Sequence, residues 1–171
     1  MMHLARTAVF LALLPQFGCD SAESAKKEEY ERVASELRPP MERVASKSAE
    51  YLRTVEQMKD STKSDRKGPG PFELIRTAMT QCLAVESDLM ALKIDPGRFE
   101  DPIVKASLTE LAASVDDYVR GRAICDRVGG MECAQACQSG WMRTNGVLVG
   151  IREEFSKAGV QLPDVGTGPE G

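Results

Sequence analysis

Cysteine is the residue type in this chain with the widest chemistry, because thiols form disulfides, bind soft metals and carry out redox catalysis. The chain has five cysteines, at positions 19, 82, 125, 133 and 137. Three of them lie between Cys125 and Trp141, a stretch that also holds a Gly129-Gly130 break and the single tryptophan. The stretch predicts a helix-turn-helix corner fastened by disulfides. No Cys-x-x-Cys pair is present, so the usual spacing of a redox-active dithiol is missing.

The four cysteines beyond the first form an even set, which allows two disulfides in three connectivities. Cys125 and Cys133 lie about equally far from the Gly129-Gly130 turn, so they would face each other across an antiparallel hairpin. We therefore expect this pair first. Cys82 is then left to pair with Cys137.

The second pair meets a geometric objection. Helices that rise 1.5 Å per residue and meet at a turn over residues 95–100 would put Cys82 level with about residue 112, roughly 15–20 Å from Cys137. A disulfide needs Cα atoms within about 7 Å of each other. The Cys82–Cys137 pair thus requires a shifted helix or a different turn. A bond between Cys133 and Cys137, one helical turn apart, is the alternative.

The same stretch permits a metal interpretation. Met131, Cys133, Cys137 and Met142 carry soft sulfur atoms, which suit Cu(I). The Cys133-x-x-x-Cys137 spacing resembles that of bacterial four-helix copper-binding proteins, and this resemblance implies thiol ligands on one helical face. Structural zinc is not indicated, because the paired Cys-x-x-Cys knuckles are missing. Disulfides are the preferred interpretation, with no cofactor and no metal expected.

Other catalytic patterns are missing from the sequence. The only histidine is His3, and there is no Gly-x-Ser-x-Gly, P-loop, dinucleotide-binding glycine pattern or His-Glu-x-x-His. Asp116-Asp117 and Glu153-Glu154 are neighbours in sequence, so on a helix each pair points about 100° apart and cannot share one substrate. These acidic pairs are interpreted as solvated surface, and the protein is predicted not to be an enzyme.

Two further groups of side chains near the corner have the chemistry to bind a ligand. Four arginines could hold an anion or an acidic partner, but a solvated rim is the preferred interpretation: Arg120, Arg122, Arg127 and Arg143. Trp141 with Tyr118 is interpreted as core packing in preference to an aromatic ligand cage.

The elements that must position these residues are predicted to be helices. Only 5% of residues are aromatic, and alanine, leucine, valine and methionine supply most of the apolar content. The apolar or small residues of the first half recur at steps of three and four: Tyr30, Ala34, Leu37, Met41, Val44, Ser48, Tyr51, Val55 and Met58. Pro39-Pro40 should interrupt this line at a cost of about 3 kcal/mol, so we expect two helices, over residues 24–37 and 40–63.

Three more helices are predicted, over residues 71–93, 101–128 and 131–159. The buried side of the first of these is predicted to carry Phe72, Ile75, Met79, Cys82, Leu83, Leu89 and Leu92. In the last, Asn145-Gly146 and the residues after it could form a turn and a short strand, but a helix is preferred because Gly146 and Gly150 would admit a close neighbour. The predicted fold is all-α, an antiparallel four-helix bundle with a kinked or split first helix and a disulfide at the corner between helices 3 and 4.

The start of the chain resembles the signal segment of bacterial lipoproteins. Arg6 precedes a short apolar run over residues 7–14, and Gly18 then stands before Cys19. In that family the cysteine is acylated and becomes the mature N-terminus, which implies lipidation of Cys19. Secretion without a lipid and an uncleaved anchor are the alternatives. We therefore predict four regions: a signal peptide (1–18), a lipid-anchored tether (19–27), the bundle domain (28–160) and a disordered tail (161–171).

The charge balance argues against nucleic acid as a partner. Without residues 1–18 the chain would keep 21 basic and 26 acidic residues, a net charge of −5, against 22 and 26 in the whole chain. Binding to a phosphate backbone needs a basic face, which this sequence does not show.

The predicted function is therefore that of a non-enzymatic envelope lipoprotein that binds another protein, as an assembly factor, pilot protein or inhibitor. Its location would be the bacterial cell envelope, anchored through Cys19 to a membrane and facing the periplasm or the exterior. The alternative is a helical bundle in the periplasm that binds a small ligand or Cu(I).

Overall fold

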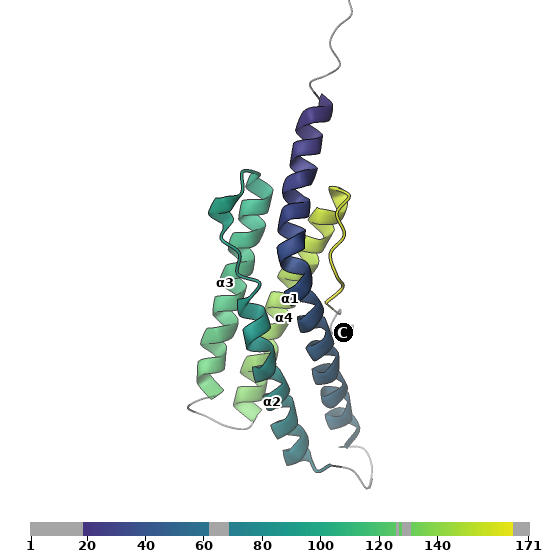
Figure 1. Cartoon of the computed structure of the whole chain (residues 1–171). Coiled ribbons are helices and arrows are strands. Elements are labelled where there is room, and N and C mark those ends of the chain that lie inside the picture. The colour runs from purple at the N-terminus through teal and green to yellow at the C-terminus, as the bar shows by residue number, and fades with distance from the viewer. Residues whose placement is uncertain (1–18, 62–68, 126, 128–130, 166–171) are drawn as a thin grey trace, which may run out of the picture.

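The computed structural model describes residues 19–61, 69–125, 127 and 131–165. Four helices form an antiparallel bundle: α1 (Cys19–Ser61), α2 (Pro71–Met90), α3 (Pro102–Cys125) and α4 (Met131–Lys157), with a short 3₁₀ turn, η2 (Pro96–Arg98), before α3 (Figure 1). No strand occurs in these ranges, so the predicted all-α fold with a disulfide at the corner between α3 and α4 is confirmed.

The helix α1 continues through Pro39 and Pro40, so the predicted division into two helices is wrong. The predicted apolar line is correct: its first seven positions, Tyr30 to Tyr51, are buried, and Val55 and Met58 pack against the same core. Leu37 and Met41, on either side of the prolines, are completely buried. Packing on both sides of the Pro-Pro pair thus offsets the lost backbone hydrogen bonds and keeps the helix in one piece.

In the described part of the chain, the first turns of α1 contribute no buried side chain to the core, although Lys26 pairs with Asp101 at the start of α3. The helix begins at Cys19, whereas the sequence predicted a tether over residues 19–27 and a helix start near Ser24. Side chains from Ala22 to Glu28 are exposed, and the first fully buried one is Tyr30. Figure 1 shows this stretch extending beyond the other helices. The predicted tether is therefore a continuation of the helix.

The chain between α2 and α3 carries core residues of its own. Leu92, Ile94 and Phe99 are buried there. The Glu29 carboxylate of α1 accepts hydrogen bonds from the backbone N–H groups of Glu100 (2.6 Å) and Asp101 (3.0 Å), which holds this segment against α1. The Asp101 side chain accepts hydrogen bonds from backbone N–H groups in the first turn of α3, as the predicted N-cap should.

The buried face of α2 differs from the prediction over most of the helix: Cys82 and Leu89 are buried as predicted, but Ile75, Met79 and Leu83 are only partly buried. Phe72 was expected inside, but its exposed fraction is 89%. The face that packs inward is instead formed by Leu74, Ala78, Cys82, Val85, Asp88 and Leu89. Phe72 comes directly after Pro71, so it belongs to a first turn that projects from the end of the bundle.

The last helix is continuous over residues 146–151, so the strand alternative is excluded. Gly146 and Gly150 do not receive a neighbouring helix, because a Cβ atom built on either would meet no atom within 4 Å. The close approach occurs at Gly140, where a Cβ atom would lie 3.1 Å from the Cα atom of Tyr118. The glycine that permits tight packing of α3 on α4 is therefore about two to three turns earlier than expected.

The packed domain extends beyond its predicted end at residue 160. Gly159 has a positive φ of 74° and turns the chain back after α4, and Val160 donates its N–H to the Phe155 carbonyl. Leu162 and Val165 are buried in the core. A disordered tail starting at 161 is thus wrong for residues 161–165, while 166–171, like the predicted signal peptide, lie outside the described residues.

Candidate functional site

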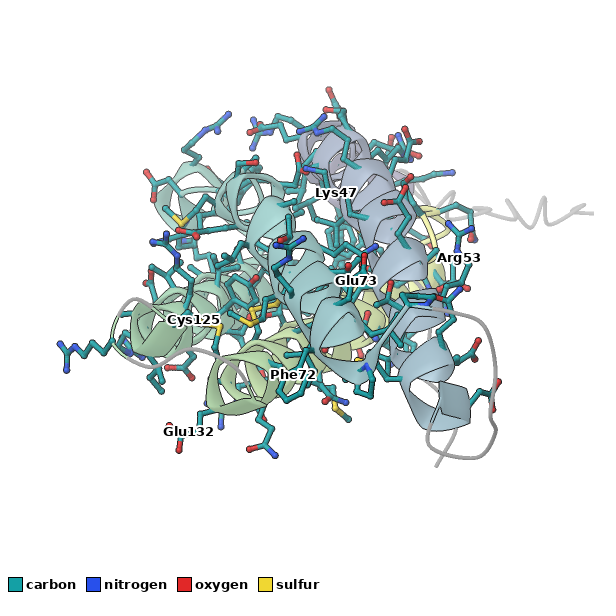
Figure 2. All side chains as sticks on the ribbon, turned by 90° about the horizontal axis from the view of Figure 1, so that it is seen from below. Lys47, Arg53, Phe72, Glu73, Cys125 and Glu132 are labelled. Atoms are coloured by element: carbon teal, nitrogen blue, oxygen red, sulfur yellow. A yellow bond between two sulfur atoms is a disulfide. The ribbon has the colours of Figure 1, made fainter. Side chains whose placement is uncertain are left out.

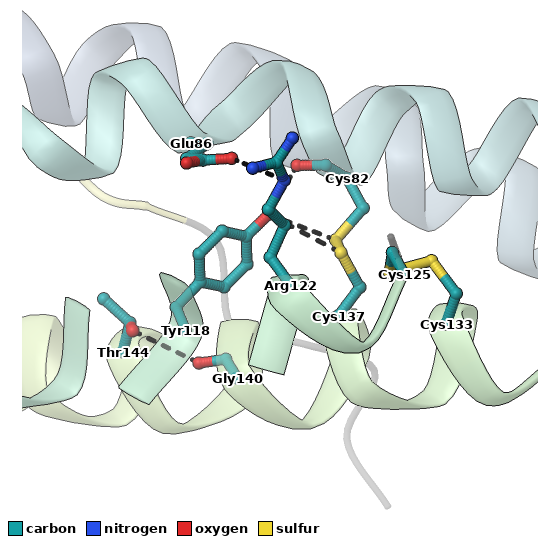
Figure 3. The surroundings of a disulfide bond; sticks show 9 residues. All are labelled: Cys82, Glu86, Tyr118, Arg122, Cys125, Cys133, Cys137, Gly140 and Thr144. Carbon is teal, nitrogen blue, oxygen red and sulfur yellow. Dashed lines mark hydrogen bonds and ion pairs between the residues drawn. A yellow bond between two sulfur atoms is a disulfide. The ribbon is translucent and has the colours of Figure 1, made fainter. Parts of the chain in front are cut away.

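Two disulfides meet at one end of α4. Cys82 of α2 is bonded to Cys137 of α4 with a Cα–Cα distance of 6.2 Å, and Cys125 at the end of α3 is bonded to Cys133 with a distance of 4.6 Å. Cys133 and Cys137 are one turn apart on α4, so the two bonds lie beside each other (Figure 3). The structure contains the two pairs preferred from the sequence.

The geometric objection to Cys82–Cys137 fails because the helices do not meet at a tight turn. The segment over residues 91–101 runs along the bundle to the far end of α3 (Figure 1). Extended chain advances up to about 3.3 Å per residue, twice the helical rise, so α3 needs more residues to descend to the level of Cys82. Cys82 accordingly contacts Tyr118 of α3, and the prediction that Cys82 would lie level with about residue 112 is wrong.

Tyr118 of α3 lies against the inner disulfide. Its hydroxyl donates to the Cys82 carbonyl at 2.5 Å and lies 3.3 Å from Cys82 Sγ and 3.6 Å from Cys137 Sγ. Burial, and secondarily the charge of Glu86, raise the pKa of Tyr118 far above its ordinary value. The phenol therefore stays protonated and acts as a hydrogen-bond donor in the corner.

The position of Tyr118 depends on Gly140. A Cβ atom at residue 140 would lie 3.1 Å from both Cα and Cδ2 of Tyr118. Four residues later, Thr144 donates to the carbonyls of Ser114 (3.3 Å) and Gly140 (3.2 Å). The two helices thus touch closely at the level of the disulfides, as Figure 3 shows for Tyr118, Gly140 and Thr144.

The interior next to the inner disulfide is almost filled. A cavity of about 10 Å³ is lined by Ser48, Tyr51, Cys82, Val85, Tyr118 and Trp141. Such a volume admits at most one water molecule, whereas small-molecule pockets usually measure about 300–1,000 Å³. Trp141 and Tyr118 have exposed fractions of 6% and 1%, so they are core residues, as predicted, and not a ligand cage.

The sulfur ligands of the alternative Cu(I) interpretation are not assembled. Cys133 and Cys137 are both bonded in disulfides, and Met142 is 61% exposed. The side chain of Met131 lies outside the described residues. Within the part of the chain that the structure describes, no three His, Cys, Asp or Glu residues gather as a metal site. Cu(I) binding remains a prediction from the spacing alone.

Three of the four arginines near the corner have carboxylate partners. Arg120 and Arg143 both pair with Asp117, and Arg122 Nε lies 3.2 Å from the carboxylate of Glu86. Each of these three arginines faces a carboxylate, with Asp117 shared between two of them, which favours the solvated-rim interpretation over an anion site. Arg127 is exposed.

The neighbouring acidic pairs also make surface ion pairs. Lys93 binds Asp116 at 2.7 Å, and Lys157 binds Glu154 at 2.6 Å. Both acidic residues are thus occupied by lysines on the surface, as the solvated-surface interpretation expects.

One ionic site was missed by the sequence analysis. Asp88 faces inward from α2 with 8% of its side chain exposed. Its carboxylate accepts hydrogen bonds from Arg43 Nε and Lys47 Nζ of α1, each at 2.6 Å. Burial by itself would raise the pKa of Asp88, but the hydrogen bonds and charges of the two cations outweigh it and lower this pKa. A signal was available: a carboxylate stands between Val85 and Leu89 on the apolar face.

Comparison with known proteins gives no relative from which a function could be carried over. No protein-family model matches the chain, and neither a curated protein nor a solved structure does. None of the helices in the described ranges combines the length and apolar character needed to cross a membrane. Function must therefore be argued from the residues of this chain.

Proposed function

We propose that the chain is a non-enzymatic lipoprotein of the bacterial cell envelope, held to a membrane by an acylated Cys19 and binding a protein partner at the other end of its bundle. The observation that carries the proposal is the position of α1. Cys19 begins this helix, whose start extends beyond the ends of the other helices (Figure 1), and its side chains stay exposed from Ala22 to Glu28, although Lys26 already pairs with Asp101 at the start of α3.

The exposed start of α1 suits an anchored spacer. The helix between Cys19 and the first fully buried side chain, Tyr30, is about 16 Å long at 1.5 Å per residue. Its side chains from Ala22 to Glu28 are small or charged, which keeps this stretch compatible with water while a lipid at Cys19 enters the bilayer. An acyl chain there would hold the bundle at a distance from the headgroups and leave the far end free.

The far end carries the largest exposed apolar side chain among the described residues. Phe72 is 89% exposed at the start of α2, and Ile124 at the end of α3 is 44% exposed. Figure 2, which looks at this end, shows Phe72 on the same end of the bundle as Cys125 and Glu132. Aromatic side chains dominate the energetics of protein interfaces, so Phe72 is the residue we assign to partner contact.

The anchor is tested by intact mass spectrometry of the protein taken from its native membrane. We expect a mass that corresponds to a chain starting at Cys19 and carrying a lipid adduct, with the adduct located on the Cys19 peptide. A Cys19→Ser variant should lose the adduct. A mature chain that starts elsewhere, or carries no lipid, would contradict the anchor.

The partner surface is tested separately by photo-crosslinking. A photoreactive amino acid replaces Phe72, and the matched control carries it at Thr80, which is exposed on the same helix. We expect one stoichiometric protein adduct from position 72 and none from position 80, and the Phe72→Ser variant should lose that partner in pull-downs. Equal labelling from both positions, or retention of the partner by Phe72→Ser, would argue against this surface.

A further inference from the structure

We propose that the Cys125–Cys133 disulfide is a thiol–disulfide exchange site, at which a thiol reacts with Cys125 and the exchange then passes along α4 to open Cys82–Cys137. The substrate class is a thiol, either a small molecule or a cysteine of another protein. The inference goes beyond the proposed function and does not depend on lipidation of Cys19.

Accessibility places the first reaction at Cys125. Cys133, Cys137 and Cys82 have exposed fractions of 0%, 1% and 4%. Cys125 is partly exposed at the end of α3. Exchange proceeds by attack of a thiolate on an accessible sulfur through a mixed disulfide. An external thiol therefore reaches Cys125 first, and Cys133 is the sulfur that leaves.

The position of Cys133 favours it as the leaving group and as the next nucleophile. It is the third residue of α4, where the helix N-terminus stabilises a thiolate. Cys137 follows one turn later on the same face, at a Cα separation of about 6 Å, inside the range of disulfides. The first turn of α4 must tighten for the two sulfurs to bond, and Cys133 lies in that turn.

The surroundings of Cys82 accommodate its release. The Tyr118 hydroxyl is 3.3 Å from Cys82 Sγ and can donate to the departing thiolate. The cavity of about 10 Å³ beside Cys82 gives the sulfur room to turn away from Cys137. Figure 3 shows the order of the groups along this path, from Cys125 and Cys133 to Cys137 and Cys82, with Tyr118 next to the last pair.

The sequence of steps is balanced in atoms and electrons. The external thiol loses its proton and forms a mixed disulfide with Cys125, which breaks Cys125–Cys133 and gives the Cys133 thiolate. That thiolate bonds to Cys137, which breaks Cys82–Cys137, and the Cys82 thiolate takes up one proton. One thiol enters and one thiol appears, so no further oxidant or reductant is needed. The outcome is that the partly exposed Cys125–Cys133 bond controls the buried link between α2 and α4.

The test uses the oxidised protein and reduced glutathione at about pH 8, with an acid quench after roughly one disulfide per chain has reacted. Free thiols are then alkylated under denaturing conditions and the protein is digested with trypsin. Cleavage after Arg76, Arg122, Arg127 and Arg143 puts Cys82, Cys125 and the pair Cys133 with Cys137 on three different peptides.

The expected map has glutathione on Cys125, the alkyl group on Cys82, and an internal disulfide in the peptide over residues 128–143. An alkyl group on Cys133, with Cys82 and Cys137 still bonded, would overturn the proposal. In the double variant Cys125→Ser with Cys133→Ser, reduction of Cys82–Cys137 by glutathione should be roughly tenfold slower or more. An unchanged rate in a variant of native helicity would also overturn it, and the wild-type map decides the matter if the variant does not fold.

Discussion

The contact between Gly140 and Tyr118 predicts opposite effects for the same substitution at different positions of α4. Gly140→Ala places a methyl group 3.1 Å from Tyr118 Cα and Cδ2, and the backbone atom cannot rotate away. Gly146→Ala and Gly150→Ala add the same methyl group where nothing lies within 4 Å. All three glycines lie inside one helix, so the intrinsic gain in helix propensity is shared.

The magnitudes separate the two effects. Replacing glycine by alanine inside a helix stabilises by about 1 kcal/mol. Inserting a methyl group into a packed contact costs about 1–3 kcal/mol. We therefore expect Gly146→Ala and Gly150→Ala each to raise the free energy of unfolding by about 0.5–1 kcal/mol. Gly140→Ala should lower it by about 1 kcal/mol, which leaves a gap of about 2 kcal/mol between this variant and the others.

The assay is urea unfolding of the three variants and the wild type, followed by circular dichroism at constant temperature with the disulfides intact. The midpoint and slope give the free energy of unfolding, and an unchanged slope shows that the unfolded state is comparable. A Gly140→Ala variant as stable as Gly146→Ala would refute the reasoning, since α3 and α4 would then have space between them at this level.

The disulfides and the buried ion pair give further expectations. Loop-closure entropy predicts that removing Cys82–Cys137, which spans 55 residues, lowers the free energy of unfolding by about 4 kcal/mol. Removing Cys125–Cys133, which spans 8 residues, should lower it by about 2.5 kcal/mol. Urea unfolding of the two double alanine variants checks this order. Asp88→Asn should cost about 2 kcal/mol at neutral pH, because it weakens charge-assisted hydrogen bonds. Because the pKa of Asp88 is lowered in the folded state, the contribution of this carboxylate to stability is present above the unfolded-state pKa of about 4 and is lost as pH falls through the folded-state pKa. The free energies of unfolding of wild type and Asp88→Asn should therefore converge in acid. A difference between them that persists in acid would contradict this assignment.

Most of the fold was predictable because the buried positions of the helices repeat at helical spacing. Along α1 the pattern is regular enough that all nine predicted positions are buried or pack on the core. The prediction that failed in α1 is the helix break at Pro39-Pro40, which rested on the local effect of proline alone. The Pro-Pro pair breaks an isolated helix, but in the folded chain Leu37 and Met41 hold both sides of it in the core.

Parts of the site could not be predicted because they depend on long-range register. Cys125 and Cys133 lie on either side of Gly129-Gly130, and this local spacing was sufficient to predict their disulfide. The partner of Cys82 depends on how far residues 91–101 carry the chain along the bundle, which periodicity does not encode. The same holds for Gly140, since only the register of α3 on α4 decides which glycine meets Tyr118.

The register of the helices also explains what the disulfide Cys82–Cys137 holds together. The helix α2 is the shortest of the four, and it packs chiefly on α1 and α4, with little contact to α3. Its polar contacts with α3 include the hydrogen bond from Tyr118 to the Cys82 carbonyl and the ion pair between Arg122 and Glu86. The covalent bond to α4 and this hydrogen bond start from the same residue of α2. Reduction of Cys82–Cys137 would remove the covalent link between α2 and α4, whereas the Arg122–Glu86 ion pair and the ion pairs of Asp88 would still hold α2 to α3 and to α1.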